Sequence, residues 1–201
     1  TNYFFNPSII LMDIYSNAAL YNASLGKNGL EALFLFNKDK WQLHYESPLK
    51  IKFQLNNLEI IKKELDNLNI NLKVLSPKLD DENELILKEA LRINASKVFI
   101  NTEYGFNEKQ RDENLRKLLA DNRIDLIEFD SSIINPKKIV TGAGTYFKVF
   151  TPYSRSFREE LNKNYLQCFP RPEKQQTKIG DSDEIPNFEL ENTLKKNALK
   201  L

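Results

Sequence analysis

The hydrophobic residues of this chain fall into short continuous runs that alternate with longer stretches of periodic pattern. Runs of this length, rich in Leu, Ile, Val and Phe, are typical of strands buried on both faces, as in a parallel sheet. Four such runs predict four strands, at residues 30–36, 70–75, 97–101 and 124–129.

The stretches between the runs carry apolar residues at three- and four-residue spacing, which places an apolar stripe on one face of a helix. The clearest example begins at Ser47-Pro48, a favoured helix start, and continues with Ile51, Leu55, Leu58, Ile61 and Leu65. Similar patterns predict helices at residues 17–24, 81–94, 107–122 and 154–164.

Strands that alternate with helices imply right-handed crossovers and helices on both faces of the sheet. The pattern therefore predicts an open α/β sandwich. In such a sheet, ligands bind outside the carboxyl ends of the strands, and the loop at residues 101–106 lies at one of these ends.

Composition excludes several classes of protein. The chain has 201 residues, enough for one domain and a tail, and its net charge of +1 provides no field to attract nucleic acid or anionic lipid. We therefore expect no direct nucleic-acid binding by this chain alone. One cysteine, Cys168, and one histidine, His44, cannot form an internal disulfide or the usual zinc sites. Without a membrane-spanning run or a secretion signal, a cytoplasmic protein is expected.

The pattern changes after residue 129. Residues 133–140 and 146–150, on either side of a turn at Gly142-Ala-Gly144, predict a short hairpin or an extended excursion. Three prolines at residues 170, 172 and 186, with few large apolar side chains near them, are typical of a linker. We predict a domain at residues 1–165, followed at 166–201 by an interdomain linker and the start of a truncated helical region.

Two interpretations of Asn107-Glu-Lys-Gln110 remain open. In the structural one, Asn107 is the N-cap of a helix, Glu108 suits the helix dipole and Gln110 completes a pattern like a capping box. In the functional one, the Glu108 carboxylate accepts paired hydrogen bonds from the N–H edge of a pterin-like ring, and the Asn107 amide supplies a donor and an acceptor. The two roles are compatible.

Other motifs carry less weight. Gly142-Ala-Gly144 lacks the lysine and hydroxyl residue of a P-loop, and no dinucleotide fingerprint follows the first strand, so a turn is expected. Trp41 and His44 flank the loop after a predicted strand, but no Ser or Cys nucleophile with a partner is evident. We assign no catalytic residue and no metal site.

Several segments, in the same order, resemble the N-terminal domain of DNA photolyases and cryptochromes. These segments are Asn17-Ala-Ala-Leu-Tyr-Asn-Ala, His44-Tyr-Glu-Ser-Pro48, Val98 to Asp112, Phe129 to Ile134, and Tyr146-Phe-Lys-Val-Phe-Thr-Pro-Tyr153. The last segment is the most specific, because neither burial nor turn chemistry requires its order. One segment departs from the family: Asn6-Pro7-Ser8-Ile9-Ile10 stands where the family has Arg-x-Asp-Leu-Arg after its first strand.

The resemblance implies a Rossmann-like three-layer α/β/α sandwich with a five-stranded, mostly parallel sheet. It also implies an antenna domain of a deoxyribodipyrimidine photolyase, a carbon-carbon lyase of DNA repair. Asn107 and Glu108 would then bind the light-harvesting chromophore, 5,10-methenyltetrahydrofolate, with a deazaflavin or a flavin as alternatives. The catalytic FAD would lie in a helical partner domain, in cis or in trans, so this chain alone is not expected to be catalytic.

Two further hypotheses remain. The chain is alternatively a non-enzymatic interaction module that keeps the photolyase N-terminal fold without chromophore binding, which the altered Asn6-Pro7-Ser8-Ile9-Ile10 segment favours. A nucleotide-binding domain of the same general fold is the third option, and the missing glycine fingerprint argues against it.

Overall fold

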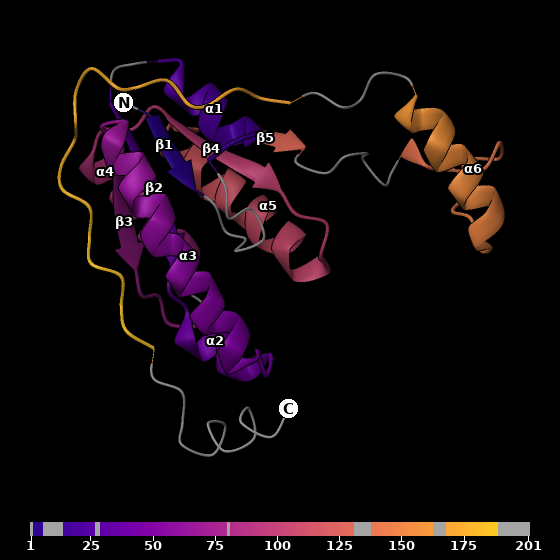
Figure 1. Ribbon diagram of the computed structural model, residues 1–201, viewed down its shortest axis with the longest axis horizontal. Coiled ribbons are helices and arrows are strands. Elements are labelled where there is room, and N and C mark those ends of the chain that lie inside the picture. Colours follow the sequence, from indigo (N-terminus) through magenta and orange to yellow (C-terminus); the bar gives the residue numbers. More distant parts are fainter. Residues whose placement is uncertain are drawn as a thin grey trace.

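The computed structural model describes residues 2–5, 14–26, 29–79, 81–130, 138–162 and 168–188. Its strands form one sheet in the order β3-β2-β1-β4-β5, and every neighbouring pair is parallel. Figure 1 shows the sheet between its helices. The strands are β1 (Asn2–Phe5), β2 (Leu30–Leu35), β3 (Asn71–Leu75), β4 (Lys97–Thr102) and β5 (Asp125–Asp130). The predicted α/β fold with parallel strands is confirmed.

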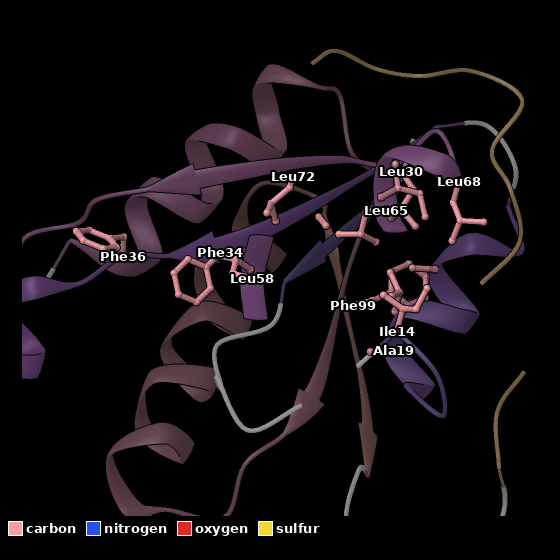
Figure 2. Packing of buried hydrophobic residues seen from close by; sticks show 14 of the residues in the cluster. Ile14, Ala19, Leu30, Phe34, Phe36, Leu58, Leu65, Leu68, Leu72 and Phe99 are labelled. Atoms are coloured by element: carbon pink, nitrogen blue, oxygen red, sulfur yellow. The ribbon is translucent and has the colours of Figure 1, made fainter. Parts of the chain in front are cut away.

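Helices cover both faces of the sheet. One buried cluster joins the sheet to α1 (Ala18–Ser24) and α3 (Pro48–Asn67), and a second joins it to α4 (Glu82–Arg92) and α5 (Phe106–Asp121). Every residue of β2 is buried, because alternate side chains enter the two clusters. Figure 2 shows part of the first cluster, where Phe34 of β2 and Leu58 of α3 lie in the same layer as Phe99 of β4.

Three local features differ from the sequence prediction. A short helix, α2 (Lys38–Leu43), follows β2 where no helix was predicted, and its N-cap Asn37 accepts a hydrogen bond from Lys40 N at 2.9 Å. Strand β5 is only half-buried, not covered on both faces, because it is an edge strand. No strand occurs among residues 138–149, so the hairpin is wrong in its described part, and the alternative of an extended excursion stays a prediction. Residues 133–137 lie outside the described residues.

The turn predicted at Gly142-Ala-Gly144 is confirmed. Gly144 has a φ of +74° and its N–H donates to Thr141 O at 2.8 Å, while Thr141 N donates to Thr145 O at 2.8 Å. Glycine is suited to that left-handed backbone conformation. The closed turn is solvent-exposed and precedes the last described helix.

That helix, α6 (Phe150–Leu161), begins four residues earlier than predicted and lies apart from the sheet (Figure 1). None of its described residues is buried. Its aromatic residues contact one another and Phe147, which precedes the helix. The ring centroids are separated by 6.3 Å in Phe147–Tyr153, 6.5 Å in Phe150–Tyr153 and 6.0 Å in Tyr153–Phe157. No described helix of the chain is long and apolar enough to cross a membrane.

The segment at residues 168–188 is extended and runs along the outer side of β3 (Figure 1). Ile185 and Phe188 pack against the first buried cluster. The domain boundary predicted at residues 165 and 166 lies outside the described residues and stays a prediction.

A buried carboxylate sits near the amino ends of the strands. Glu31 of β2 is 1% exposed and accepts hydrogen bonds from Arg92 Nη2 at 2.6 and 2.8 Å and from Asn71 Nδ2 at 2.5 Å. Arg92 also donates to Glu89 at 2.5 Å. The bonds to Glu89 and Glu31 raise the pKa of Arg92 above its ordinary value. The ion pair therefore ties α4 to β2.

We expect Arg92→Met to destabilise the fold by about 2 kcal/mol, because it leaves the Glu31 charge buried with Asn71 as its remaining partner. Urea unfolding measures the change. The exposed Lys88 on the same helix provides a matched control, Lys88→Met. Equal unfolding midpoints for the two variants would contradict a structural role for the ion pair.

Candidate functional site

One cavity lies among the segments that follow β2, β3 and β4 in the chain. Its volume is about 340 Å³, within the range of small-molecule sites, and α2, the loop after β3, α4 and α5 all contribute to its wall. The lining residues are Lys40, Leu43, His44, Leu79, Glu82, Asn83, Asn107, Arg111 and Asn114. The cavity therefore lies on the side of the sheet where the strands end and where the topology predicted a ligand, but no residue of the predicted loop at 101–106 lines it.

The start of α5 differs from the sequence interpretation. Gly105 is the N-cap, so the prediction that Asn107 caps the helix is wrong. Glu108 occupies the third helical position, which the interpretation had given to Gln110. Its carboxylate folds back over Gly105 and fills the space that a Cβ there would take. Glu108 therefore lies in the first turn of α5, where the helix dipole favours an acidic residue.

The structure separates the two predicted site residues. Asn107 is exposed and lines the cavity, together with Arg111 and Asn114, which follow it at four- and seven-residue spacing on one face of α5. Glu108 is half-buried and does not belong to the lining, because its carboxylate lies against Gly105. Only Asn107 faces the cavity directly.

Across the cavity, a polar cluster fixes α2 to α4. Glu82 is 8% exposed and accepts from Asn37 Nδ2 at 2.8 Å and from Lys40 Nζ at 3.1 Å. Asn83 donates to Arg111 O at 3.2 Å, and its Oδ1 is buried without a hydrogen-bond partner in the described structure. The wall thus presents amides and a paired lysine, groups that recognise the polar edge of a heterocycle.

Arg111, which also lines the cavity, belongs to a buried cluster of charged side chains. It contacts Asp112 at 2.7 Å and Glu103 at 3.0 Å, and all three side chains are largely buried. Burial raises the pKa of Asp112, Arg111 opposes this rise, and Glu103 and Glu128 add to it. Burial lowers the pKa of Arg111, but Asp112 and Glu103 outweigh it, so that the net shift is upward. Asp112 therefore favours its protonated form mainly because it is buried, and Arg111 favours its protonated form because two carboxylates lie beside it.

Sequence reasoning missed a pair of asparagines at the neighbouring strand ends. Asn101, at the carboxyl end of β4, donates to Asn17 Oδ1 at 2.9 Å and accepts from Ala19 N at 3.2 Å. Asn17 is the N-cap of α1 and accepts from Leu20 N at 3.0 Å. Both asparagines are buried, so the first turn of α1 is fixed to β4. The available signal was an asparagine directly after a buried run, together with a second before a helix.

The remaining candidates of the sequence are placed as follows. Trp41 of α2 is buried, with its ring centroid 5.0 Å from that of Phe36. His44 is the C-cap of α2 and lines the cavity. No group of side chains that could hold a metal ion occurs in the part of the chain that the structure describes.

Comparison with known proteins identifies the family. A sequence model described as DNA photolyase matches residues 14–174, which is most of the chain. The chain belongs to the DNA photolyase family. It corresponds to the N-terminal α/β domain of photolyases and cryptochromes, as its sequence predicted.

A deoxyribodipyrimidine photo-lyase of Buchnera aphidicola is 31% identical over 146 residues, which are 71% of this chain and 30% of that protein. The photolyase-family domain thus spans about a third of the length of the curated relatives it matches.

Two solved structures share its fold. A Synechocystis cryptochrome superimposes with a TM-score of 0.72 at 18% identity and covers 94% of this chain and 38% of its own. An archaeal photolyase of Sulfolobus tokodaii, described with two FAD molecules, gives 0.65 at 18% identity and covers 91% and 38%.

We expect Asp112→Asn to reveal the raised pKa of Asp112. The folded domain holds this proton more tightly than the unfolded chain, where the pKa is 3.8. The resulting stabilisation is complete below that value and is lost as pH rises through the folded pKa. The free energy of unfolding of the wild type, relative to the variant, should therefore increase as pH falls from about 7 to about 4.

Urea titrations at a series of pH values measure this difference. Asp125→Asn removes an exposed aspartate from β5 and is the matched control. If the free energy of unfolding of the wild type, relative to Asp112→Asn, decreased as pH falls, the effect of Arg111 on the pKa of Asp112 would outweigh that of burial.

Proposed function

We propose that this chain is the N-terminal light-harvesting domain of a deoxyribodipyrimidine photolyase, which binds an antenna chromophore in the cavity at the carboxyl ends of β2, β3 and β4. The observation that carries the proposal is the position of Asn107 in the wall of that cavity, within a domain of the DNA photolyase family. DNA repair itself would require the catalytic FAD of a helical partner domain.

The proposed chromophore is 5,10-methenyltetrahydrofolate. Asn83, Asn107 and Asn114 offer amide donors and acceptors to the polar edge of a pterin ring, while Leu43 and Leu79 offer apolar surface to its faces. When bound, this group would absorb light and pass the excitation to FAD. A deazaflavin or a flavin presents a similar ring edge, and the Sulfolobus relative described with two FAD molecules keeps flavin as the alternative.

Glu108 would bind the chromophore only after its carboxylate leaves Gly105. In the present arrangement the carboxylate lies where a Gly105 Cβ would be, at the N-terminus of α5, the helix that carries Asn107. Once it turns toward the cavity, a carboxylate can accept two N–H bonds from the ring edge. The proposal therefore includes a rotation of this side chain on ligand binding.

The partner is proposed to be an FAD-binding helical domain, in cis or in trans. Tyr146, Val149 and Phe150 are 70%, 62% and 77% exposed, and they continue onto the aromatic residues of α6. An aromatic helix face of this kind is typical of a surface that another polypeptide covers. The length of the relatives supplies a candidate, because this chain spans 30% of the Buchnera protein.

The alternative is a non-enzymatic interaction module. The position of the Glu108 carboxylate against Gly105 and the altered segment at residues 6–10 favour it, since both are compatible with the fold and neither requires a chromophore. The two proposals differ in one measurable property, which is the binding of a chromophore.

We expect methenyltetrahydrofolate to raise the melting temperature of the wild-type chain and to show altered near-ultraviolet absorbance when bound. Glu108→Gln should weaken binding about tenfold, since a charged hydrogen bond contributes roughly 1.5 to 3 kcal/mol. Glutamine has nearly the size of glutamate, so this variant removes the charge of the acceptor and leaves the shape of the side chain almost unchanged. Asn107→Ala should weaken binding as well.

Gln110→Ala is the matched control, because Gln110 is exposed on the same helix and does not line the cavity. It should bind as the wild type does. If the ligand changes neither absorbance nor melting in the wild type, chromophore binding is wrong and the interaction module stands.

We expect the paired change Phe150→Ala and Tyr153→Ala to abolish recovery of a flavin-containing complex when the tagged chain is purified from its own cells. Removing two aromatic side chains from the centre of an interface commonly costs more than 2 kcal/mol for each. Arg155→Ala, an exposed change on the same helix, serves as the control. Flavin recovery equal to that of the wild type would show that the partner binds elsewhere.

A further inference from the structure

Strand β3 forms one edge of the sheet, and its outward backbone groups are occupied by residues 182 and 183. Leu72 N donates to Ser182 Oγ at 2.9 Å, and Asp183 N donates to Leu72 O at 2.8 Å. Val74 N donates to Asp183 Oδ2 at 2.9 Å. An edge strand with these groups free is a template for pairing with another chain.

The side chains of Ser182 and Asp183 are suited to occupy the outward backbone groups of β3. The Ser182 hydroxyl accepts from Leu72 N and also donates to Asp66 Oδ1 at 2.7 Å, so both of its hydrogen-bonding capacities are used. The Asp183 carboxylate bonds to Val74 N and pairs with Lys73 Nζ at 3.0 Å. The neighbouring Asp181 is fully exposed and makes no bond to β3 that the structure describes.

The same segment is attached before and after this point. Gln175 is 2% exposed, and its N–H donates to Leu68 O at 2.8 Å, while its carbonyl accepts from Asn69 Nδ2 at 2.8 Å. At the other end, the ring of Phe188 lies 6.2 Å from that of Trp41, edge to face. The segment thus crosses from the amino end of β3 to α2.

We propose that Ser182 and Asp183 form a clip that holds residues 168–188 on the edge of β3 and makes this segment a structural part of the α/β domain. The clip has a consequence for the cavity. It keeps Phe188 against Trp41 of α2, the helix that also contributes Lys40, Leu43 and His44 to the cavity wall. Release of the clip would loosen both the sheet edge and the packing of α2.

The test is the paired change Ser182→Ala and Asp183→Ala in the full chain, followed by amide hydrogen exchange. The amides of Leu72 and Val74 should exchange at least tenfold faster than in the wild type, because they lose their acceptors. The amide of Ile100 in β4, an interior strand of the sheet, should be unchanged. Trp41 is the one tryptophan of the chain, so quenching of its fluorescence by acrylamide should increase as Phe188 withdraws.

Asp181→Ala is the matched control and should leave both measurements at their wild-type values. Phe188→Ala shows the quenching expected when only the ring contact is lost. Wild-type exchange at Leu72 and Val74 in the paired variant would overturn the clip. Faster exchange of the Leu72 and Val74 amides with unchanged quenching of Trp41 would show that the clip does not hold Phe188, and this result would overturn its role in holding residues 168–188. A paired variant that does not fold would also overturn it, since the clip is proposed to hold one edge and not the core.

Discussion

A parallel sheet that helices cover on both faces leaves its polar side chains one place to meet, the ends of the strands. In this chain the constraint is strict for β2, in which every residue is buried. Functional groups therefore cannot come from the middle of the strands and must be presented by the loops and helix starts that follow them. The cavity beside α2, α4 and α5 is the result, and its polar lining comes from helix residues and from His44, the C-cap of α2.

The same constraint explains why buried polar clusters occur at both ends of the sheet. At the carboxyl ends, Asn17 and Asn101 satisfy the first turn of α1, and Glu82 joins α2 to α4. At the amino ends, Glu31 and Arg92 join β2 to α4. Each cluster connects a helix to an element distant in sequence, so it fixes the position of the helix along the sheet in a way that apolar contacts, which are not directional, cannot.

Periodicity predicted the strands after β1 and the long helices. A strand buried on both faces appears in the sequence as a continuous apolar run, and a helix buried along one stripe appears as apolar residues at three- and four-residue spacing. Periodicity missed α2, whose six residues Lys38–Leu43 are too few to show a helical period and which depends on the Asn37 cap. The sequence pattern misplaced the start of α5, because asparagine is a favoured N-cap by residue type. The actual N-cap is Gly105, whose missing Cβ leaves room for the Glu108 carboxylate. Prolines at 170, 172 and 186 indicated a linker, and the contacts of Ser182 and Asp183 with β3 left no periodic signal.

The position of Glu108 at the start of α5 would compete with its proposed role in chromophore binding. As the third residue of α5, it lies in the first turn, where the helix dipole stabilises a carboxylate by up to about 1 kcal/mol. A chromophore that recruits the same carboxylate must first offset that contribution, which lowers its affinity by up to about fivefold. Asn107 has no such competing role, because it is exposed and already lines the cavity. The asparagine is therefore the fixed part of the proposed site, and the glutamate is the part that ligand binding has to move.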